Sequence, residues 1–273
     1  MIIPYENIKL NLEHFSEFDP AKKTILFLHG FTGSANDWKV IADKIDKRFN
    51  KIGLDLIGHG KSGSPSDLKF YQIDSIVEQI EEAIRLLGLN KIVLCGYSMG
   101  GRVALKFALD RQNLVSGLIL ESTSAGIRKM NERLSRKQND DELANFIINN
   151  PIEDFITGWL DREIFGTIRR FSNEKIKRIK EEKNKNSQTG LANSLRGYGT
   201  GVMSYLGSEL ITLKIPVLLI SGGLDEKFTQ INQNLRKLFK SAKHKIINNA
   251  GHNTHLEEPA KFISIVNPFL NRI

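Results

Sequence analysis

Short runs of hydrophobic residues alternate along this chain with longer segments that are hydrophobic on one face only. The runs at 24–28, 91–95, 117–120 and 217–220 contain almost no polar residue, which is typical of strands covered on both faces of a parallel sheet. Between them, segments such as 73–87 carry apolar residues at helical spacing. This alternation predicts βαβ units with right-handed crossovers, and therefore a mostly parallel central sheet flanked by helices.

A long middle segment departs from this alternation. Residues 122–208 are helical and charged in pattern, with 15 Lys and Arg against 11 Asp and Glu, and they show no buried strand pattern. We therefore expect an α/β core of residues 1–121 and 209–273, interrupted after the sixth strand by a helical cap, or lid, of residues 122–208. Ligands of such sheets bind beyond the carboxyl ends of the strands, where this cap is expected to lie. Residues 8–12 predict an early, antiparallel strand, and 259–270 predict a closing helix.

The composition fits a globular protein and narrows the range of functions. The chain has 273 residues, of which 40% are hydrophobic and 26% charged, and its formal net charge is +8. The positive charges are not interleaved with aromatic residues, so no nucleic-acid partner is expected. The N-terminus lacks a basic segment followed by an apolar core, and no run approaches the roughly 18 apolar residues of a membrane helix. We therefore expect a cytoplasmic location and no membrane partner.

The segment from Gly96 to Gly100, Gly-Tyr-Ser-Met-Gly, carries the strongest signal for chemistry. It follows a predicted strand and precedes a helical pattern at 100–109, which is the context of a nucleophile elbow. Such an elbow holds its serine, here Ser98, in a strained turn, and glycines two residues to either side remove side chains that would clash there. The serine oxygen then lies at a helix N-terminus, where backbone N–H groups favour negative charge.

Two further residues at the ends of predicted strands complete a candidate catalytic triad. Asp225 follows the strand at 217–220, and His252 follows a short apolar segment that ends at Ile247. The chain order Ser98, Asp225, His252 is that of the α/β-hydrolase fold, which is the fold we predict. In such a triad the histidine acts as a base toward the serine, and the aspartate orients the imidazole and stabilises its charged form.

The loop after the strand at 24–28 is expected to supply one half of an oxyanion hole. The backbone N–H of Phe31 is the candidate donor in this loop, and the N–H of Met99 is the second. His29 is expected to hold the loop in place rather than to transfer protons. No metal site is predicted, because the remaining histidines lack the clustered spacing of metal ligands.

These motifs make the chain similar to a known family. It resembles the 2-succinyl-6-hydroxy-2,4-cyclohexadiene-1-carboxylate synthases of menaquinone biosynthesis, which belong to the α/β-hydrolase superfamily. The resemblance implies a lyase that eliminates pyruvate, by a 2,5-elimination and without a cofactor, from 2-succinyl-5-enolpyruvyl-6-hydroxy-3-cyclohexene-1-carboxylate. It covers nearly the whole chain and rests on the segments 28–34, 55–65, 96–102, 121–127, 190–197, 225–228 and 250–252.

The substrate of this family is a small anionic polycarboxylate, so cationic side chains are needed in its pocket. The resemblance implies that Arg102, four residues after Ser98, and Arg136 in the cap bind the substrate. It also implies that Tyr97 contacts the substrate and that Trp159 lines the pocket. A cation in the first turn of a helix opposes the helix dipole, and this small penalty favours a role for Arg102 in meeting a substrate anion.

The chain departs from the family pattern at one position. Members can carry a third substrate-binding arginine eight residues before the leucine that matches Leu191, and this chain has Lys183 there. Lysine keeps the charge but loses the bidentate geometry of arginine. Lys183 therefore acts as a point charge toward the substrate, or Arg178 or Lys185 replaces it, or the third contact is absent. Arg196 is expected to have a structural role.

Two other functions are compatible with parts of this pattern. A carboxylic-ester or carbon–carbon-bond hydrolase would use Ser98 as a covalent nucleophile rather than within a base system. A non-catalytic ligand receptor on this fold is expected to have a broken triad, whereas all three members are present here. The pattern indicates no particular oligomeric state.

Overall fold

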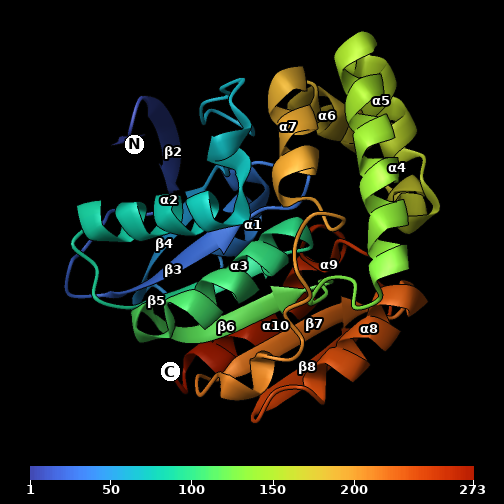
Figure 1. Ribbon diagram of the computed structural model, residues 1–273. Helices are drawn as coiled ribbons and strands as arrows, with labels where there is room; N and C mark the ends of the chain where they lie inside the picture. The colour runs from blue at the N-terminus through green and yellow to red at the C-terminus, as the bar shows by residue number, and fades with distance from the viewer.

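The computed structural model describes residues 1–273 and contains one eight-stranded sheet (Figure 1). In the sheet the strands follow the order β1-β2-β4-β3-β5-β6-β7-β8. β1 pairs with β2, and β2 with β4, in antiparallel fashion, and all other neighbours are parallel. The predicted mostly parallel sheet is therefore confirmed. The strands are β1 (Ile2–Tyr5), β2 (Ile8–His14), β3 (Lys23–Leu28), β4 (Phe49–Leu54), β5 (Ile92–Tyr97), β6 (Val115–Glu121), β7 (Val217–Gly222) and β8 (Ala242–Ile247).

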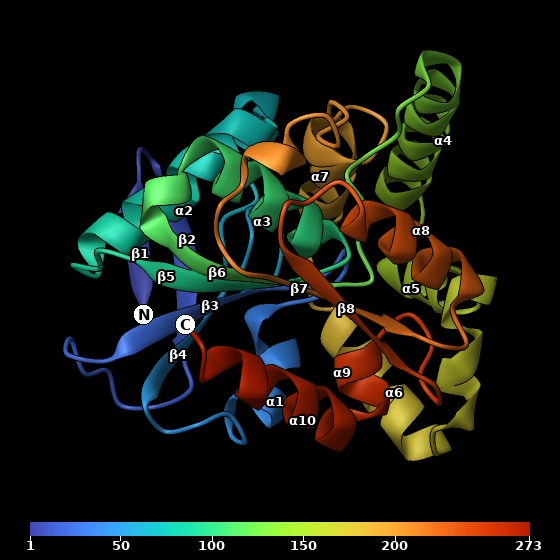
Figure 2. The ribbon, with the colours of Figure 1, turned by 90° about the horizontal axis from the view of Figure 1, so that it is seen from below.

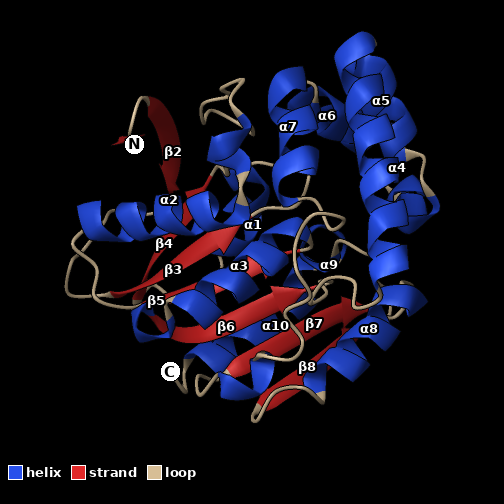
Figure 3. Ribbon diagram, viewed as in Figure 1, coloured by secondary structure: helices blue, strands red, loops and turns tan.

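Each buried strand sends alternate side chains into two separate hydrophobic clusters. In β3, Ile25 and Phe27 pack into one cluster, and Leu26 and Leu28 pack into the other. Helices cover both faces of the sheet, as Figures 2 and 3 show. This double cover explains why the central strands are almost entirely apolar. On one face lie α2 (Ile73–Leu86), α3 (Met99–Asp110) and α8 (Glu226–Arg236), and on the other lie α1 (Lys39–Ala42) and α10 (Pro259–Leu270).

The apolar pattern did not predict β4, although this strand pairs with both β2 and β3. Its sequence contains Asn50 and Lys51, which are polar yet buried. The Asn50 amide satisfies its hydrogen bonds inside the protein, donating to the Asp19 carbonyl at 2.7 Å and to Thr24 Oγ1 at 3.1 Å. A buried polar residue of this kind breaks an apolar run without breaking the strand.

Four α-helices and two 3-10 helices lie between β6 and β7, and all but the last, η5 (Leu210–Thr212), fall where the helical insertion was expected. Figure 1 shows the helices of the insertion gathered in the upper right of the view, on one side of the sheet. Nine of their buried residues form a third hydrophobic cluster of their own, and residues 122–208 are called here the cap segment. All helices of the chain are too short or too polar to span a bilayer. The elements of the cap segment are α4 (Met130–Asn149), α5 (Ile152–Leu160), η4 (Glu163–Arg170), α6 (Asn173–Lys183) and α7 (Gln188–Tyr198).

Candidate active site

Ser98 stands in a strained turn between β5 and α3. Its backbone has φ 50° and ψ −107°, which is the left-handed half of the map that a residue with a side chain rarely adopts. The two flanking glycines are required by space: a Cβ on Gly96 would lie 2.5 Å from the carbonyl oxygen of Gly100, and one on Gly100 would lie 2.5 Å from that of His29. The turn therefore has the geometry of a nucleophile elbow.

The three residues of the candidate triad form one chain of hydrogen bonds. His252 Nε2 lies 3.1 Å from Ser98 Oγ, and His252 Nδ1 lies 2.6 Å from Asp225 Oδ2. Asp225 is the N-cap of α8, and its second oxygen accepts a hydrogen bond from the Phe228 backbone N–H at 3.1 Å. This arrangement leaves the imidazole with a proton on Nδ1 and a free lone pair on Nε2, facing the serine hydroxyl.

Glu121, at the end of β6, links the elbow to the histidine loop. Its backbone carbonyl accepts a hydrogen bond from the Ser98 N–H at 2.8 Å. Its fully buried carboxylate accepts from Thr254 Oγ1 at 2.7 Å and from the His255 backbone N–H at 3.0 Å, and lies 2.6 Å from His255 Nδ1. Glu121 begins the segment 121–127 on which the family resemblance partly rests, but no role was predicted for it. Its position could have indicated a role, because a carboxylate at the end of an otherwise apolar strand is unusual.

The candidate oxyanion donors lie in the same cavity as Ser98. Phe31 and Met99 both line the cavity that contains Ser98, and Met99 is the first residue of α3, a position whose N–H has no acceptor within the helix. His29 holds the loop of Phe31: its Nε2 accepts from the Leu56 N–H at 3.0 Å, and its Nδ1 lies 2.8 Å from the Gly30 carbonyl. Burial lowers the pKa of His29, which keeps this ring neutral and suited to a structural role.

A cavity of about 1120 Å³ opens over Ser98 between the sheet and the cap segment. Arg102, one turn into α3, lines it from below, partly buried and without an acidic partner; its buried Nε has no hydrogen bond. Burial, together with the nearby charge of Arg136, lowers the pKa of Arg102 to about 10. An arginine held charged under these conditions is well placed to receive an anion.

The cap segment contributes the second arginine and the tryptophan that were expected. Arg136 Nε donates to Asp140 Oδ1 at 2.8 Å, which leaves the rest of its guanidinium free to face the cavity. Trp159 lines the same cavity and packs edge-on against Phe31, with 5.1 Å between the ring centroids. The structure thus brings Arg102, Arg136 and Trp159 together around Ser98, as the resemblance implied.

Tyr97 does not line this cavity, contrary to the expectation that it contacts the substrate. The side chain is 7% exposed and lies behind the triad, with its ring centroid 5.4 Å from that of His252 and 5.2 Å from that of His255. Successive side chains at the end of a strand point in opposite directions, so the residue before Ser98 points away from the space that Ser98 faces. Burial raises the pKa of Tyr97 well above its usual value, so the hydroxyl stays neutral.

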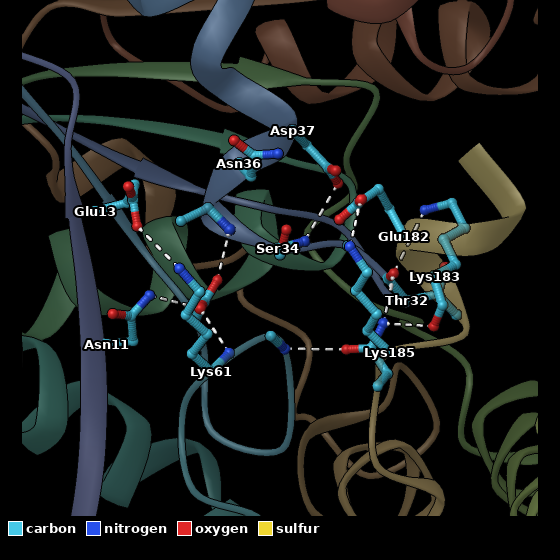
Figure 4. A pocket seen from close by; sticks show the side chains of 15 residues that line it. Asn11, Glu13, Thr32, Ser34, Asn36, Asp37, Lys61, Glu182, Lys183 and Lys185 are labelled. Carbon is cyan, nitrogen blue, oxygen red and sulfur yellow. Dashed lines mark hydrogen bonds and ion pairs between the residues drawn. The ribbon is translucent and has the colours of Figure 1, made fainter. Parts of the chain in front are cut away.

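Lys183 is also outside the Ser98 cavity. It ends α6 and lines a separate polar cavity of about 350 Å³, where its Nζ donates to the Thr32 carbonyl at 3.4 Å (Figure 4). Thr32 also lines this second cavity, whereas the preceding residue, Phe31, lines the Ser98 cavity. Neither proposed replacement for Lys183 lines the Ser98 cavity: Arg178 pairs with Glu174, and Lys185 pairs with Glu182.

Several residues that line the Ser98 cavity were not identified from the sequence. Arg162 and Lys227 add positive charge to its wall, and Ser124 adds a hydroxyl. Arg162 lies one turn after Trp159, a spacing that could have indicated a shared surface. No three or more His, Cys, Asp or Glu side chains come together in a way that could hold a metal ion.

Comparisons with known proteins place this geometry in a family. The alpha/beta hydrolase fold family matches residues 23–259. A provisionally named 2-succinyl-6-hydroxy-2,4-cyclohexadiene-1-carboxylate synthase of Bacillus subtilis is 39% identical over 93% of this chain and 92% of its own length. The Klebsiella pneumoniae protein of that name is 28% identical over 90% of this chain and 92% of its own length.

Solved structures agree with these relatives. The structure of MenH from S. aureus superposes with a TM-score of 0.90 at 32% identity, covering 96% of this chain and 98% of that one. An enol-lactonase from Burkholderia xenovorans LB400 has a TM-score of 0.86 at 19% identity, covering 99% of this chain and all of its own, and shows the shared fold alone. The predicted fold and resemblance are confirmed: the chain belongs to the alpha/beta hydrolase fold family and, within it, to the 2-succinyl-6-hydroxy-2,4-cyclohexadiene-1-carboxylate synthases.

Proposed function

We propose that this protein is the lyase of menaquinone biosynthesis that converts 2-succinyl-5-enolpyruvyl-6-hydroxy-3-cyclohexene-1-carboxylate into 2-succinyl-6-hydroxy-2,4-cyclohexadiene-1-carboxylate and pyruvate. The observation that carries the proposal is Arg102, a partly buried arginine without an acidic partner whose buried Nε has no hydrogen bond, one helical turn from a hydrogen-bonded Ser-His-Asp triad. A simple ester gives no reason to keep an unpaired charge there, because burying it costs free energy. A polycarboxylate substrate gives such a reason, because its carboxylates can pair with the guanidinium. The names of the similar proteins support the same reaction.

In the proposed reaction the triad acts as a base system. His252 draws the proton from Ser98, and Ser98 removes or relays the proton of ring carbon 2, which is acidic because it neighbours the succinyl ketone. The electron pair moves through the ring double bond, the bond between carbon 5 and oxygen breaks, and enolpyruvate leaves and takes up a proton to become pyruvate. Negative charge that develops on the ketone oxygen is stabilised by the backbone N–H groups of Phe31 and Met99.

The cationic wall positions the substrate for this step. Arg102 and Arg136 bind carboxylates, and Trp159 forms an apolar wall against the ring. Binding through several carboxylates fixes the ring relative to Ser98 and excludes water from the proton that is removed. The residues of the chain supply all of these roles, so the proposal involves no cofactor.

Pyruvate release from the cyclohexene substrate, followed with lactate dehydrogenase, tests the proposal. We expect the wild-type protein to release pyruvate, and Ser98→Ala to lower kcat by about a thousandfold or more, as removal of a triad member does in related enzymes. Ser264→Ala, which removes a hydroxyl from the exposed surface of α10, is the matched control and is expected to retain wild-type activity. A wild-type protein that releases no pyruvate but cleaves simple esters with a burst of product would contradict the lyase proposal and favour the hydrolase.

A further inference from the structure

Arg162 lies at the mouth of the Ser98 cavity and has no acidic partner. It directly precedes η4, and its guanidinium carbon lies 4.4 Å from the centroid of the Trp159 ring. The indole thus orients the guanidinium in a stacked position without neutralising its charge. Arg162 forms no ion pair and no side-chain hydrogen bond within the chain, although Glu142 and Glu163 line the same cavity.

The three arginines of this cavity repel one another. Partial burial, and after it the charge of Arg136, lower the pKa of Arg162, and the charge of Arg136 also acts on Arg102. Asp140 is the one acid that pairs with any of them, and it pairs with Arg136. Neighbouring arginines of which only one is paired with an acid are unfavourable in the free protein and become favourable when anions bind.

The charges of the proposed substrate require one cation more than Arg102 and Arg136 provide. Its name specifies three carboxylates: one on the succinyl group, one on the enolpyruvyl group and one on the ring. Lys183, the third cation expected from the sequence, donates to the Thr32 carbonyl in a different cavity. We infer that Arg162 binds the third carboxylate of the substrate and replaces Lys183 in that role. This inference rests on the proposed function for the identity of the ligand.

Paired substitutions test the role of Arg162. Arg162→Met keeps an unbranched side chain over Trp159 but removes the charge, and Arg162→Lys keeps the charge but removes the planar fork. We expect Arg162→Met to raise KM for the cyclohexene substrate about tenfold and to change kcat by less than about threefold, with Arg162→Lys between it and the wild type. Arg170→Met is the control, because Arg170 is an exposed arginine of the same 3-10 helix that does not line the cavity.

Binding without turnover separates this inference from the proposed function. In the Ser98→Ala background, calorimetry with the same substrate is expected to give a Kd about tenfold weaker for Arg162→Met than for Arg170→Met. If the wild-type protein releases no pyruvate, the proposed function fails, and the calorimetric comparison still decides the role of Arg162. Equal KM and equal Kd values in Arg162→Met and Arg170→Met would overturn the inference, whether or not pyruvate is released.

Discussion

At the scale of single residues, the proposed role of Arg102 in substrate binding opposes the stability of the folded protein. The side chain keeps its positive charge in a partly buried place, where its Nε has no hydrogen bond and the charge of Arg136 acts against it more strongly than that of Asp140 acts for it. Burial disfavours the charged form, so the pKa of Arg102 falls to about 10 in the folded protein. In the unfolded chain the same group is solvated and binds its proton more tightly. The folded state therefore carries a free-energy cost at neutral pH that the unfolded state does not.

Arg102→Met is expected to stabilise the protein while it impairs activity. The free energy of unfolding should rise by about 1 kcal/mol or more, because an unpaired buried charge is replaced by an apolar side chain of similar length. The gain should be constant from pH 6 to about pH 9, where Arg102 stays protonated in both states. It should shrink as the pH rises through about 10, because the folded protein then releases the proton.

Urea unfolding at several pH values measures this gain, with KM for the cyclohexene substrate measured in parallel. Arg170→Met, at an exposed arginine, is expected to change neither quantity. A loss of stability in Arg102→Met would show that the guanidinium has a structural partner in the folded protein and is not held for a ligand.

At the scale of elements, Asn186 joins the cap segment to two loops of the core. This buried side chain, just after α6, donates to the Thr32 carbonyl at 3.0 Å and accepts from the Gly60 N–H at 3.0 Å. Thr32 has a φ of 65°, so its loop is held in a conformation that a β-branched residue rarely adopts. Since the neighbouring Phe31 supplies a proposed oxyanion donor, the cap positions that donor as well as covering the cavity.

Asn186→Ala is therefore expected to lower kcat about tenfold or more and to leave KM within about threefold, because a transition-state donor is displaced while the arginines remain. Steady-state pyruvate release gives both constants. Lys185→Ala, beside it and paired only with Glu182, should behave as the wild type. If Asn186→Ala raised KM and left kcat unchanged, the link would hold the substrate site and not the oxyanion loop.

Some elements could be predicted because neighbouring residues determine them, and others could not because they depend on contacts with distant parts of the chain. Strands buried on both faces were predicted because a continuous apolar run is a local property, and the nucleophile elbow was predicted because its glycines meet a local steric need. β4 was not predicted, since the partners that satisfy its Asn50 come from distant parts of the chain. β8, an edge strand of largely exposed polar residues, presents only a short apolar end.

The residues of the candidate site likewise fall into those that could be predicted from the sequence and those that could not. Ser98, Asp225 and His252 follow strands whose ends meet at one edge of the sheet, so their meeting follows from topology. Tyr97 and Lys183 were placed at the substrate by resemblance of sequence position. Sequence position does not fix the direction of a side chain, and the structure points Tyr97 behind the triad and Lys183 toward Thr32.

At the scale of the whole molecule, charge is expected to speed the arrival of an anionic substrate. The chain has a formal net charge of +8, and the cavity wall combines Arg102, Arg136, Arg162 and Lys227. Asp140, Glu142 and Glu163 line the same cavity, so its wall keeps a small excess of positive charge. A positive excess in a low-dielectric cleft attracts anionic ligands over several ångströms, and salt screens that attraction.

Raising the ionic strength from about 0.05 M to about 0.5 M should therefore lower kcat/KM for the tricarboxylate about fivefold or more and leave kcat nearly unchanged. Steady-state pyruvate release in sodium chloride and in potassium chloride measures this, and the two salts should act alike because screening depends on ionic strength. An equal fall in kcat would instead indicate that salt acts on the chemical step or on the fold.

The separate hydrophobic cluster of the cap segment has a consequence for how this protein can evolve. Arg136, Trp159 and Arg162 all come from one uninterrupted stretch of chain that packs largely on itself, whereas Ser98 and its partners come from the core. In a gene, such a stretch is a single block with two junctions. One recombination event between relatives would exchange the side chains proposed to bind the substrate and leave those proposed to transfer the proton as they were. New substrates can thus be acquired by inheritance of a module, without a series of intermediates that bind neither the old ligand nor the new one.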